Sequence, residues 1–287
     1  MFYKKGDKLD LHIHSAYSSD GKYSLVELLT MAEEKKLDVI SFTDHNDLSI
    51  YDELKTIDYK KYFSGKIVNG VEINVTYDGN LVEALVYDFN LEKMKSFWFL
   101  NKDNLIRVQK ETGAFVAEKY RKLGLIIDDD FVDDITVNGP YVLYEEIIKH
   151  KQNLWFLKKC KITHFGYFYR KVLLNKRSKY YVDLSAFFPH LDDLHDIAKN
   201  AGGITILAHP FGQYDIASPK LFINKVIKNH AVDGLECIHR TISKSESTYL
   251  LKLCDKYNLV KTAGSDFHRM GHMMGKSKKS GLDTIIY

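Results

Sequence analysis

The sequence predicts an α/β fold built around a mostly parallel sheet, arranged either as a barrel or as a doubly wound sheet. Three observations lead to this prediction. Short β-branched runs alternate with helical patterns, polar residues follow the ends of those runs, and one long segment interrupts the alternation. With 287 residues, of which 45% are hydrophobic, the chain can bury a substantial core.

Seven runs have the composition of strands, and helices are expected between most of them. The strand-like runs are residues 9–13, 39–43, 66–71, 82–86, 204–208, 234–238 and 260–263. The clearest helix begins at Ser24, where Glu27 completes a capping box. Further helices are expected over residues 191–200, 221–229 and 245–257, the last with a capping box formed by Ser243 and Glu246.

Residues 92–189 interrupt this alternation. The stretch is helix-like and rich in aromatic residues, and its one strand signal covers residues 180–184. We therefore expect a discontinuous barrel domain formed by residues 1–91 and 190–287, with residues 92–189 as a mostly helical insertion. The order of the elements gives this division, because the strand and helix alternation resumes only after the insertion.

The insertion contains an unusual segregation of charge. Residues 149–182 include ten Lys or Arg and no Asp or Glu, and aromatic residues are interleaved with them. Cationic groups bind phosphates and aromatic rings stack on bases, so this segment predicts a substrate lid with Arg170 and Lys171 as contacts. The alternative is an ordinary solvated helical face whose aromatic residues pack on the barrel.

Composition excludes several classes of protein. Net charge is +3 from 41 basic and 38 acidic residues, which gives little reason to expect general nucleic-acid binding. Neither a signal-peptide core nor an apolar run of about eighteen residues occurs. Cys160, Cys237 and Cys254 are widely spaced and odd in number, which favours reduced thiols. We expect a cytoplasmic protein without a membrane anchor or an evident obligate protein partner.

The residues that suggest chemistry follow the ends of the predicted strands. His12 and His14 lie two residues apart on the first strand, so both side chains point to the same face. Four other strands end in metal-ligand residue types, at Asp44-His45, Glu72, His209 and Asp266-Phe267-His268. Carboxyl ends of strands meet at one edge of such folds, which would bring these side chains together. Histidine with carboxylate suits zinc, manganese or iron better than calcium.

These motifs resemble those of the polymerase and histidinol phosphatase (PHP) family of metal-dependent phosphoesterases. The matching stretches, which occur in the order typical of the family, are Asp10-Leu11-His12-Ile13-His14-Ser15, Thr43-Asp44-His45, Gly70-Val71-Glu72, Ala208-His209-Pro210 and Gly264-Ser265-Asp266-Phe267-His268. Together they span about residues 8–90 and 191–268. The resemblance implies a distorted TIM-like (β/α)7 barrel that binds two or three divalent ions, Mn, Fe or Zn, at its mouth.

The resemblance also implies a set of ligands. One metal would be held by His12, His14, Glu72 and Asp266, a second by the bridging Glu72 with His209, and a third by Asp20, His45 and His268. The turn before Asp20 is one residue longer than the commonest family spacing, which would place Ser19 at the ligand position, and we favour Asp20 because serine is a poor ligand. Where many members have a histidine, this chain has Glu83, so either Glu83 or His164 is expected to complete the second metal site.

The expected reaction is hydrolysis of a phosphate ester by a metal-bridging hydroxide near Glu72. Glu72 and Asp266 would be catalytic, His239 is a candidate general acid, and Arg240 is a candidate phosphate clamp. Such a mechanism requires no serine or cysteine nucleophile. The substrate would be a nucleotide, a short oligonucleotide or another small phosphorylated metabolite.

Two other functions are compatible with the sequence. Amidohydrolase barrels that cleave amides or lactones also begin with a His-X-His strand, although they usually have a lysine or histidines at the middle strand ends, where this chain has Glu72. A non-catalytic regulatory module could keep the fold without the activity. Retention of nearly all the ligand types argues against that module, and metal content would distinguish it from an enzyme.

Overall fold

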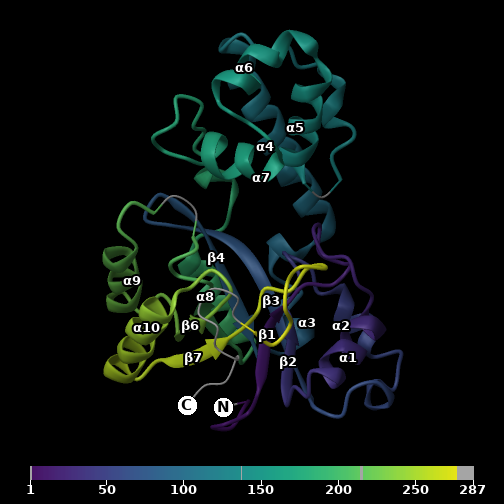
Figure 1. The fold of residues 1–287 in the computed structure, drawn as a ribbon, viewed down its shortest axis with the longest axis vertical. Coiled ribbons are helices and arrows are strands. Elements are labelled where there is room, and N and C mark those ends of the chain that lie inside the picture. Colours follow the sequence, from purple (N-terminus) through teal and green to yellow (C-terminus); the bar gives the residue numbers. More distant parts are fainter. Residues whose placement is uncertain (1, 137, 214–215, 277–287) are drawn as a thin grey trace.

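The computed structural model describes residues 2–136, 138–213 and 216–276. Its centre is a seven-stranded sheet in which the strands follow each other in chain order. A further bridge joins Ile13 to Phe267, so the sheet nearly closes into a barrel, as predicted (Figure 1). The strands are β1 (Leu9–Ile13), β2 (Val39–Phe42), β3 (Lys66–Tyr77), β4 (Asn80–Tyr87), β5 (Ile204–Leu207), β6 (Gly234–Ile238) and β7 (Val260–Ala263).

One strand departs from the predicted pattern, because β4 is antiparallel to both β3 and β5. The other neighbouring pairs are parallel. A two-residue turn, Asp78-Gly79, joins β3 to β4, and both residues have positive φ angles of 52° and 67°. Such a turn forms a tight hairpin in place of a crossover helix. Consequently β3 extends to Tyr77, beyond its predicted end at Val71.

Helices surround the barrel. They are α1 (Leu25–Glu34), α2 (Ser49–Leu54), α3 (Leu91–Met94), α8 (Leu191–Asn200), α9 (Pro219–Lys228) and α10 (Lys244–Tyr257). Both predicted capping boxes are confirmed, Ser24 with Glu27 before α1 and Ser243 with Glu246 before α10. The buried faces of these helices and the strands form one hydrophobic core.

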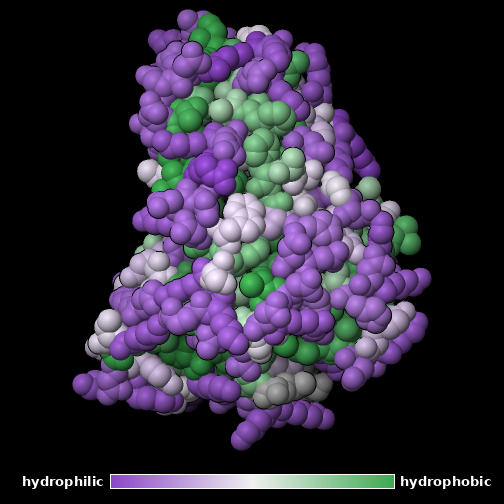
Figure 2. All heavy atoms as spheres, turned by 180° about the vertical axis from the view of Figure 1, so that it is seen from behind, coloured by the Kyte–Doolittle hydropathy of each residue, from purple (hydrophilic) through white to green (hydrophobic). Residues whose placement is uncertain are grey.

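Most of the segment between α3 and α8 forms a separate helical lobe above the barrel (Figure 1). It contains α4 (Lys102–Lys122), α5 (Gly139–Lys149), α6 (Leu154–Lys159) and α7 (Phe165–Tyr167), followed by a π-helical turn, Phe168–Leu173. This lobe has a hydrophobic core of its own. In Figure 2 the lobe is narrower than the barrel below it, and hydrophilic residues cover most of both parts.

The predicted strand at residues 180–184 does not form. Tyr180 and Val182 are buried in the core of the helical lobe, and the Val182 amide donates to the Leu173 carbonyl. The apolar pattern of this stretch therefore reflects packing on helices. The three cysteines are free, and Cys237 and Cys254 are buried. Within the described residues, none of the helices has the length and apolar character that crossing a membrane requires.

Candidate metal centre

The first group of candidate ligands lies where β1 and β7 end. His12 Nε2 is 3.1 Å from Glu72 Oε2, and His14 Nε2 is 3.3 Å from the same oxygen. Asp266 Oδ1 lies 3.4 Å from His14 Nε2 and 3.6 Å from His12 Nε2. All four residues are buried. A Cβ on Gly264 would lie 2.2 Å from His12 Cβ, so only glycine lets β7 approach β1 this closely.

A second group contains His14, Asp20, His45 and His268. His268 Nε2 lies 2.9 Å from Asp20 Oδ2, and His45 Nε2 lies 3.7 Å from it. Ser18 donates a hydrogen bond of 2.9 Å to Asp20 and thereby fixes the turn. The structure thus brings Asp20 to the position for which the sequence left Ser19 as the alternative.

The third group consists of Glu72, Glu83 and His209. His209 Nε2 lies 3.1 Å from Glu72 Oε1 and 3.4 Å from Glu83 Oε2. Asn74, which faces Glu83 across the β3–β4 hairpin, donates its side-chain amide to Glu83 Oε1 at 3.3 Å. Asn46 in turn donates to Asn74 at 3.2 Å. Glu83 therefore occupies a defined position although its strand runs in the antiparallel direction.

These residues fit divalent metal ions. His14 Nε2 and His45 Nδ1 are buried nitrogens without a hydrogen-bond partner among the described residues, yet each lies 3.3 Å from Glu72 Oε2. Unpartnered buried nitrogens are costly unless something else satisfies them. A cation among these imidazole and carboxylate groups would do so, and mixed nitrogen and oxygen ligands are typical of Mn, Fe and Zn.

Electrostatics at the cluster favour ionised carboxylates. Burial alone would raise the pKa of Glu72, but the neighbouring His12 and His45 outweigh it and hold this pKa well below its ordinary value. For Asp266, burial is similarly outweighed by His14 and His239, which hold its pKa low. Burial lowers the pKa of His12, whereas Glu72 and Glu236 raise it well above the usual range. Anionic ligands thus face the imidazoles, as a cation site requires.

Glu236 is a residue of this centre that the sequence analysis did not identify. It is fully buried on β6, its Oε1 lies 3.0 Å from His12 Nδ1, and its Oε2 accepts the His209 backbone amide at 2.7 Å. A carboxylate on Nδ1 orients the ring and leaves Nε2 available for a metal. The sequence contains one signal for its role, because Glu236 is a charged residue within an otherwise apolar strand.

Two further buried carboxylates hold the loops that present the ligands. Asp10 accepts hydrogen bonds from the Ser265 amide at 2.9 Å and hydroxyl at 2.6 Å. Asp44 accepts from the Ser15 amide and hydroxyl, both at 2.6 Å. Burial raises the pKa of each carboxyl to about 6. These contacts fix the chain beside His14 and Asp266.

Asp266 is also held by Arg240 and His239. The Arg240 Nε donates to Asp266 Oδ2 at 2.6 Å, which engages the guanidinium that the sequence suggested as a phosphate clamp. His239 Nε2 lies 3.4 Å from the same oxygen, and its Nδ1 accepts the Thr241 amide at 3.2 Å. Burial lowers the pKa of His239, although Glu236 opposes this. Both residues therefore lie against Asp266, and their roles as general acid and phosphate clamp stay predictions.

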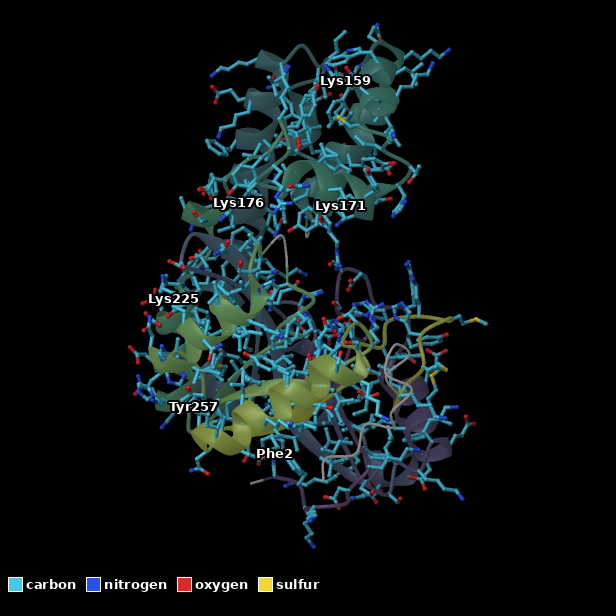
Figure 3. The ribbon with its side chains drawn as sticks, turned by 60° about the vertical axis from the view of Figure 1, so that its left-hand side comes forward. Phe2, Lys159, Lys171, Lys176, Lys225 and Tyr257 are labelled. Atoms are coloured by element: carbon cyan, nitrogen blue, oxygen red, sulfur yellow. The ribbon has the colours of Figure 1, made fainter. Side chains whose placement is uncertain are left out.

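The predicted site residues of the insertion, His164, Arg170 and Lys171, lie outside the metal-ligand groups found among the described residues. His164 is exposed, is 2.9 Å from Thr163, and is not part of the metal-ligand groups. Arg170 and Lys171 are exposed on the π-helical turn, and Figure 3 shows Lys171 in the part of the insertion next to the barrel. Burial raises the pKa of neighbouring Tyr169, and the Glu83 carboxylate raises it further.

A separate acidic group in the insertion has another explanation. Asp128, Glu146 and His150 lie together, but Lys149 Nζ is 3.0 Å from Asp128 and 3.2 Å from Glu146. The lysine ammonium already supplies the cation that the carboxylates need. We therefore interpret this group as a structural ion-pair network of the insertion.

The fold and the donor set together define an α/β barrel with several groups of candidate metal ligands at its mouth. The family profile of the PHP domain matches residues 10–205, which is more than half of the chain. The chain belongs to the PHP domain family. This confirms the family that its strand-end motifs indicate and agrees with metal-dependent phosphoester or related hydrolytic chemistry in general.

Relatives and solved structures agree with this assignment. The chain is 23% identical over 265 residues to a 5′-3′ exoribonuclease of Haemophilus influenzae, covering 91% of this chain and 90% of that protein. A structure described as a metal-dependent phosphoesterase from Bifidobacterium adolescentis superposes with a TM-score of 0.67 at 19% identity, covering 98% and 94% of the two chains. An amidohydrolase from Chromobacterium violaceum has the same TM-score and identity, covering 96% and 90%. At such identities the superpositions show a shared fold.

Proposed function

We propose that this chain hydrolyses phosphate esters of nucleotides or short oligonucleotides, with single-stranded RNA as the first substrate class to test. The observation that carries the proposal is the sharing of Glu72. Its Oε2 lies within 3.1–3.3 Å of nitrogens of His12, His14 and His45, and its Oε1 lies 3.1 Å from His209. Adjoining metal sites of this kind are typical of phosphoryl-transfer centres. The similarity to an exoribonuclease over most of the chain supports RNA.

Three groups of side chains would hold the metal ions. They are His12, His14, Glu72 and Asp266; His14, Asp20, His45 and His268; and Glu72, Glu83 and His209. When bound, the divalent ions would supply the activation of water and the charge stabilisation that phosphate-ester hydrolysis requires. The chain's own residues provide orientation. Glu236 fixes the His12 ring, while Arg240 and His239 fix Asp266. Arg170 and Lys171 would bind substrate phosphates from the insertion, because they are exposed cations on a turn next to the barrel.

The test begins with protein purified without chelator. Bound metals are measured by elemental analysis, and phosphate or nucleotide release is assayed with 5′-phosphorylated oligoribonucleotides, nucleoside bisphosphates and histidinol phosphate, with and without added Mn²⁺. His12→Ala and Asp266→Asn should lose bound metal and nearly all activity. Asp134→Asn, which changes an exposed carboxylate in the insertion, is the matched control.

Each other result identifies a different function. Turnover of amides or lactones with inert phosphate esters would assign the chain to amidohydrolase chemistry. Protein that binds metal and turns over neither class would indicate a non-catalytic module. Protein that retains no metal after reconstitution with Mn²⁺ would remove the basis of the proposal.

A further inference from the structure

A chain of aromatic rings leads from the side of the insertion next to the barrel to its exposed surface. Tyr169 lies on the π-helical turn Phe168–Leu173, whose Lys171 is in the part of the insertion next to the barrel (Figure 3). Leu81 of β4, two residues before Glu83, packs against the core of the insertion. The Tyr169 ring lies 5.6 Å from Phe165 with an angle of 26° between the rings. Phe165 in turn contacts Tyr141 edge to face at 5.2 Å. The outermost ring, Tyr141, is 45% exposed.

Several features of this chain of rings differ from those of a closed core. Tyr169 and Phe165 are only partly buried, and both belong to the periphery of the second hydrophobic core. The neighbouring side chains of Arg170 and Lys171 are exposed cations. Tyr167 and His164 add two further partly or fully exposed rings on the same turn, 6.5 Å apart. Aromatic surface bordered by cations, on the side of the insertion next to the barrel, suits a flexible polyanion that carries flat bases.

We propose that Tyr169, Phe165 and Tyr141 form a stacking track for a single-stranded nucleic acid whose scissile nucleotide lies at the metal centre. The inference rests on the proposed function and extends it to the nucleotides beyond the cleaved one. The rings lie too close together to admit a base between them, since insertion needs about twice the ~3.4 Å spacing of stacked bases. Bases therefore lie on the solvent-facing sides, and the track accommodates roughly two to three nucleotides.

Charge favours nucleic acid over a protein segment as the occupant. The basic stretch from Lys149 to Val182, which carries Tyr169 and Phe165, contains no acidic residue, so phosphates meet cations along that part of the track. The cations of this stretch are spread along the insertion, because Lys171 lies next to the barrel and Lys159 lies toward the far end of the insertion (Figure 3). An acidic peptide would satisfy the cations but would leave the rings without a stacking partner.

Binding is measured with a 3′-fluorescein-labelled, 5′-phosphorylated octaribonucleotide by anisotropy, using the full chain in EDTA so that hydrolysis is blocked. Tyr141→Ala and Phe165→Leu should each weaken octamer binding by about tenfold, the usual order for one lost base–ring stack. Phe165→Leu keeps the apolar volume, and Tyr141→Phe should bind like the wild type. Trp155→Ala is the matched control, because Trp155 is a 41% exposed aromatic on α6 in the same insertion.

A length series in the presence of Mn²⁺ gives a second readout. The two variants should lose kcat/KM on tetramers and octamers and keep the wild-type value on dinucleotides, which do not extend beyond Tyr169. Equal loss at every length, equal loss in Trp155→Ala, displacement of the octamer by polyglutamate at equal charge, or no octamer binding by the wild type would each overturn the track. Anisotropy does not depend on turnover, so failure of the proposed function and failure of the track give different results.

Discussion

Glu236 contacts two of the candidate metal ligands although it is not itself at a strand end. Its carboxylate meets His12 Nδ1 and the His209 amide, and it is fully buried. A partner of this kind fixes the tautomer and the orientation of a metal-binding imidazole, and its loss typically costs 10–100-fold in metal affinity.

We predict that Glu236→Gln weakens Mn²⁺ binding by about 10–100-fold, because a neutral amide orients His12 less strongly. Competition with a fluorescent chelator measures the affinity. Glu34→Gln, an exposed glutamate on α1, serves as the control for loss of a carboxylate. Unchanged affinity in Glu236→Gln would mean that packing alone holds the His12 ring.

The candidate metal pocket that contains Glu83 has a different set of donor atoms from the pocket that contains Asp20. Glu72, Glu83 and His209 supply two carboxylates and one imidazole, whereas His14, His45, His268 and Asp20 supply three imidazoles and one carboxylate. Oxygen ligands suit Mn²⁺ and Mg²⁺, and imidazole suits Zn²⁺. The two pockets should therefore prefer different ions.

We predict that Glu83→His increases the Zn²⁺ to Mn²⁺ ratio bound by the protein, and that Glu83→Gln loses about one metal ion per chain. Elemental analysis after dialysis against equimolar Mn²⁺ and Zn²⁺ measures both effects. The same occupancy and the same ratio in all three proteins would show that Glu83 is no ligand, in which case its hydrogen bond to Asn74 accounts for its burial.

The candidate ligands could be predicted to the extent that they end strands. His12, His14, His45, Glu72, His209, Asp266 and His268 all lie in the groups that the structure brings together. Glu236 was missed because the apolar run of residues 234–238 reads as an ordinary buried strand. Roles were harder to predict than positions, since nothing in the sequence shows that Arg240 would pair with Asp266.

At the scale of elements, the insertion depends on a buried glutamate. Glu146 on α5 accepts the Asp128 amide at 3.0 Å and lies 2.6 Å from His150 Nε2. Burial alone would raise its pKa, but the Asp128 amide, His150 and Lys149 outweigh burial and lower it. A lowered folded-state pKa stabilises the fold above the unfolded pKa of about 4.3, and this contribution is lost as pH falls through the folded value.

We predict that Glu146→Gln destabilises the insertion at pH 7 by about 1–3 kcal/mol, because a neutral amide cannot satisfy the same donors. Urea unfolding followed by hydrogen exchange in α4 and α5 measures the effect in metal-free protein. Glu145→Gln, its exposed neighbour, is the control. The difference between wild type and Glu146→Gln should shrink below about pH 4.3, and a constant difference down to pH 3 would contradict this origin.

Elements were predictable where local signals agreed with packing. The capping boxes at Ser24 and Ser243 and the strand at residues 234–238 occur where they were predicted. The direction of β4 was not predicted, although Asp78-Gly79 is a typical two-residue hairpin turn. Residues 180–184 have a strand-like composition, but their apolar side chains pack on helices and no strand pairs with them among the described residues.

At the scale of the whole molecule, two hydrophobic cores suggest two units of stability. The barrel core and the insertion core comprise different sets of buried residues, with Phe187 and Phe188 packed against both. We propose that they unfold separately. The metal centre is formed by barrel residues, so bound metal should stabilise the barrel alone.

We predict two calorimetric transitions, of which only one rises when Mn²⁺ is added. At a concentration of about 100 times Kd the stabilisation is about 2.7 kcal/mol, which corresponds to roughly 5–10 °C for a domain of this size. A proline substitution at exposed Glu118 in α4 should lower the other transition. A single transition that shifts as a whole in both experiments would show that the cores unfold together.

The sharing of Glu72 has a thermodynamic consequence. One oxygen of this carboxylate lies beside His12, His14 and His45, and the other lies beside His209 and the pocket of Glu83. An ion on one side would fix the carboxylate and withdraw its charge from the other side. We therefore expect affinity at one pocket to depend on occupancy of the next, and linkage would make this dependence equal in both directions. The centre would then fill as a coupled unit whose stoichiometry follows the free metal concentration nonlinearly.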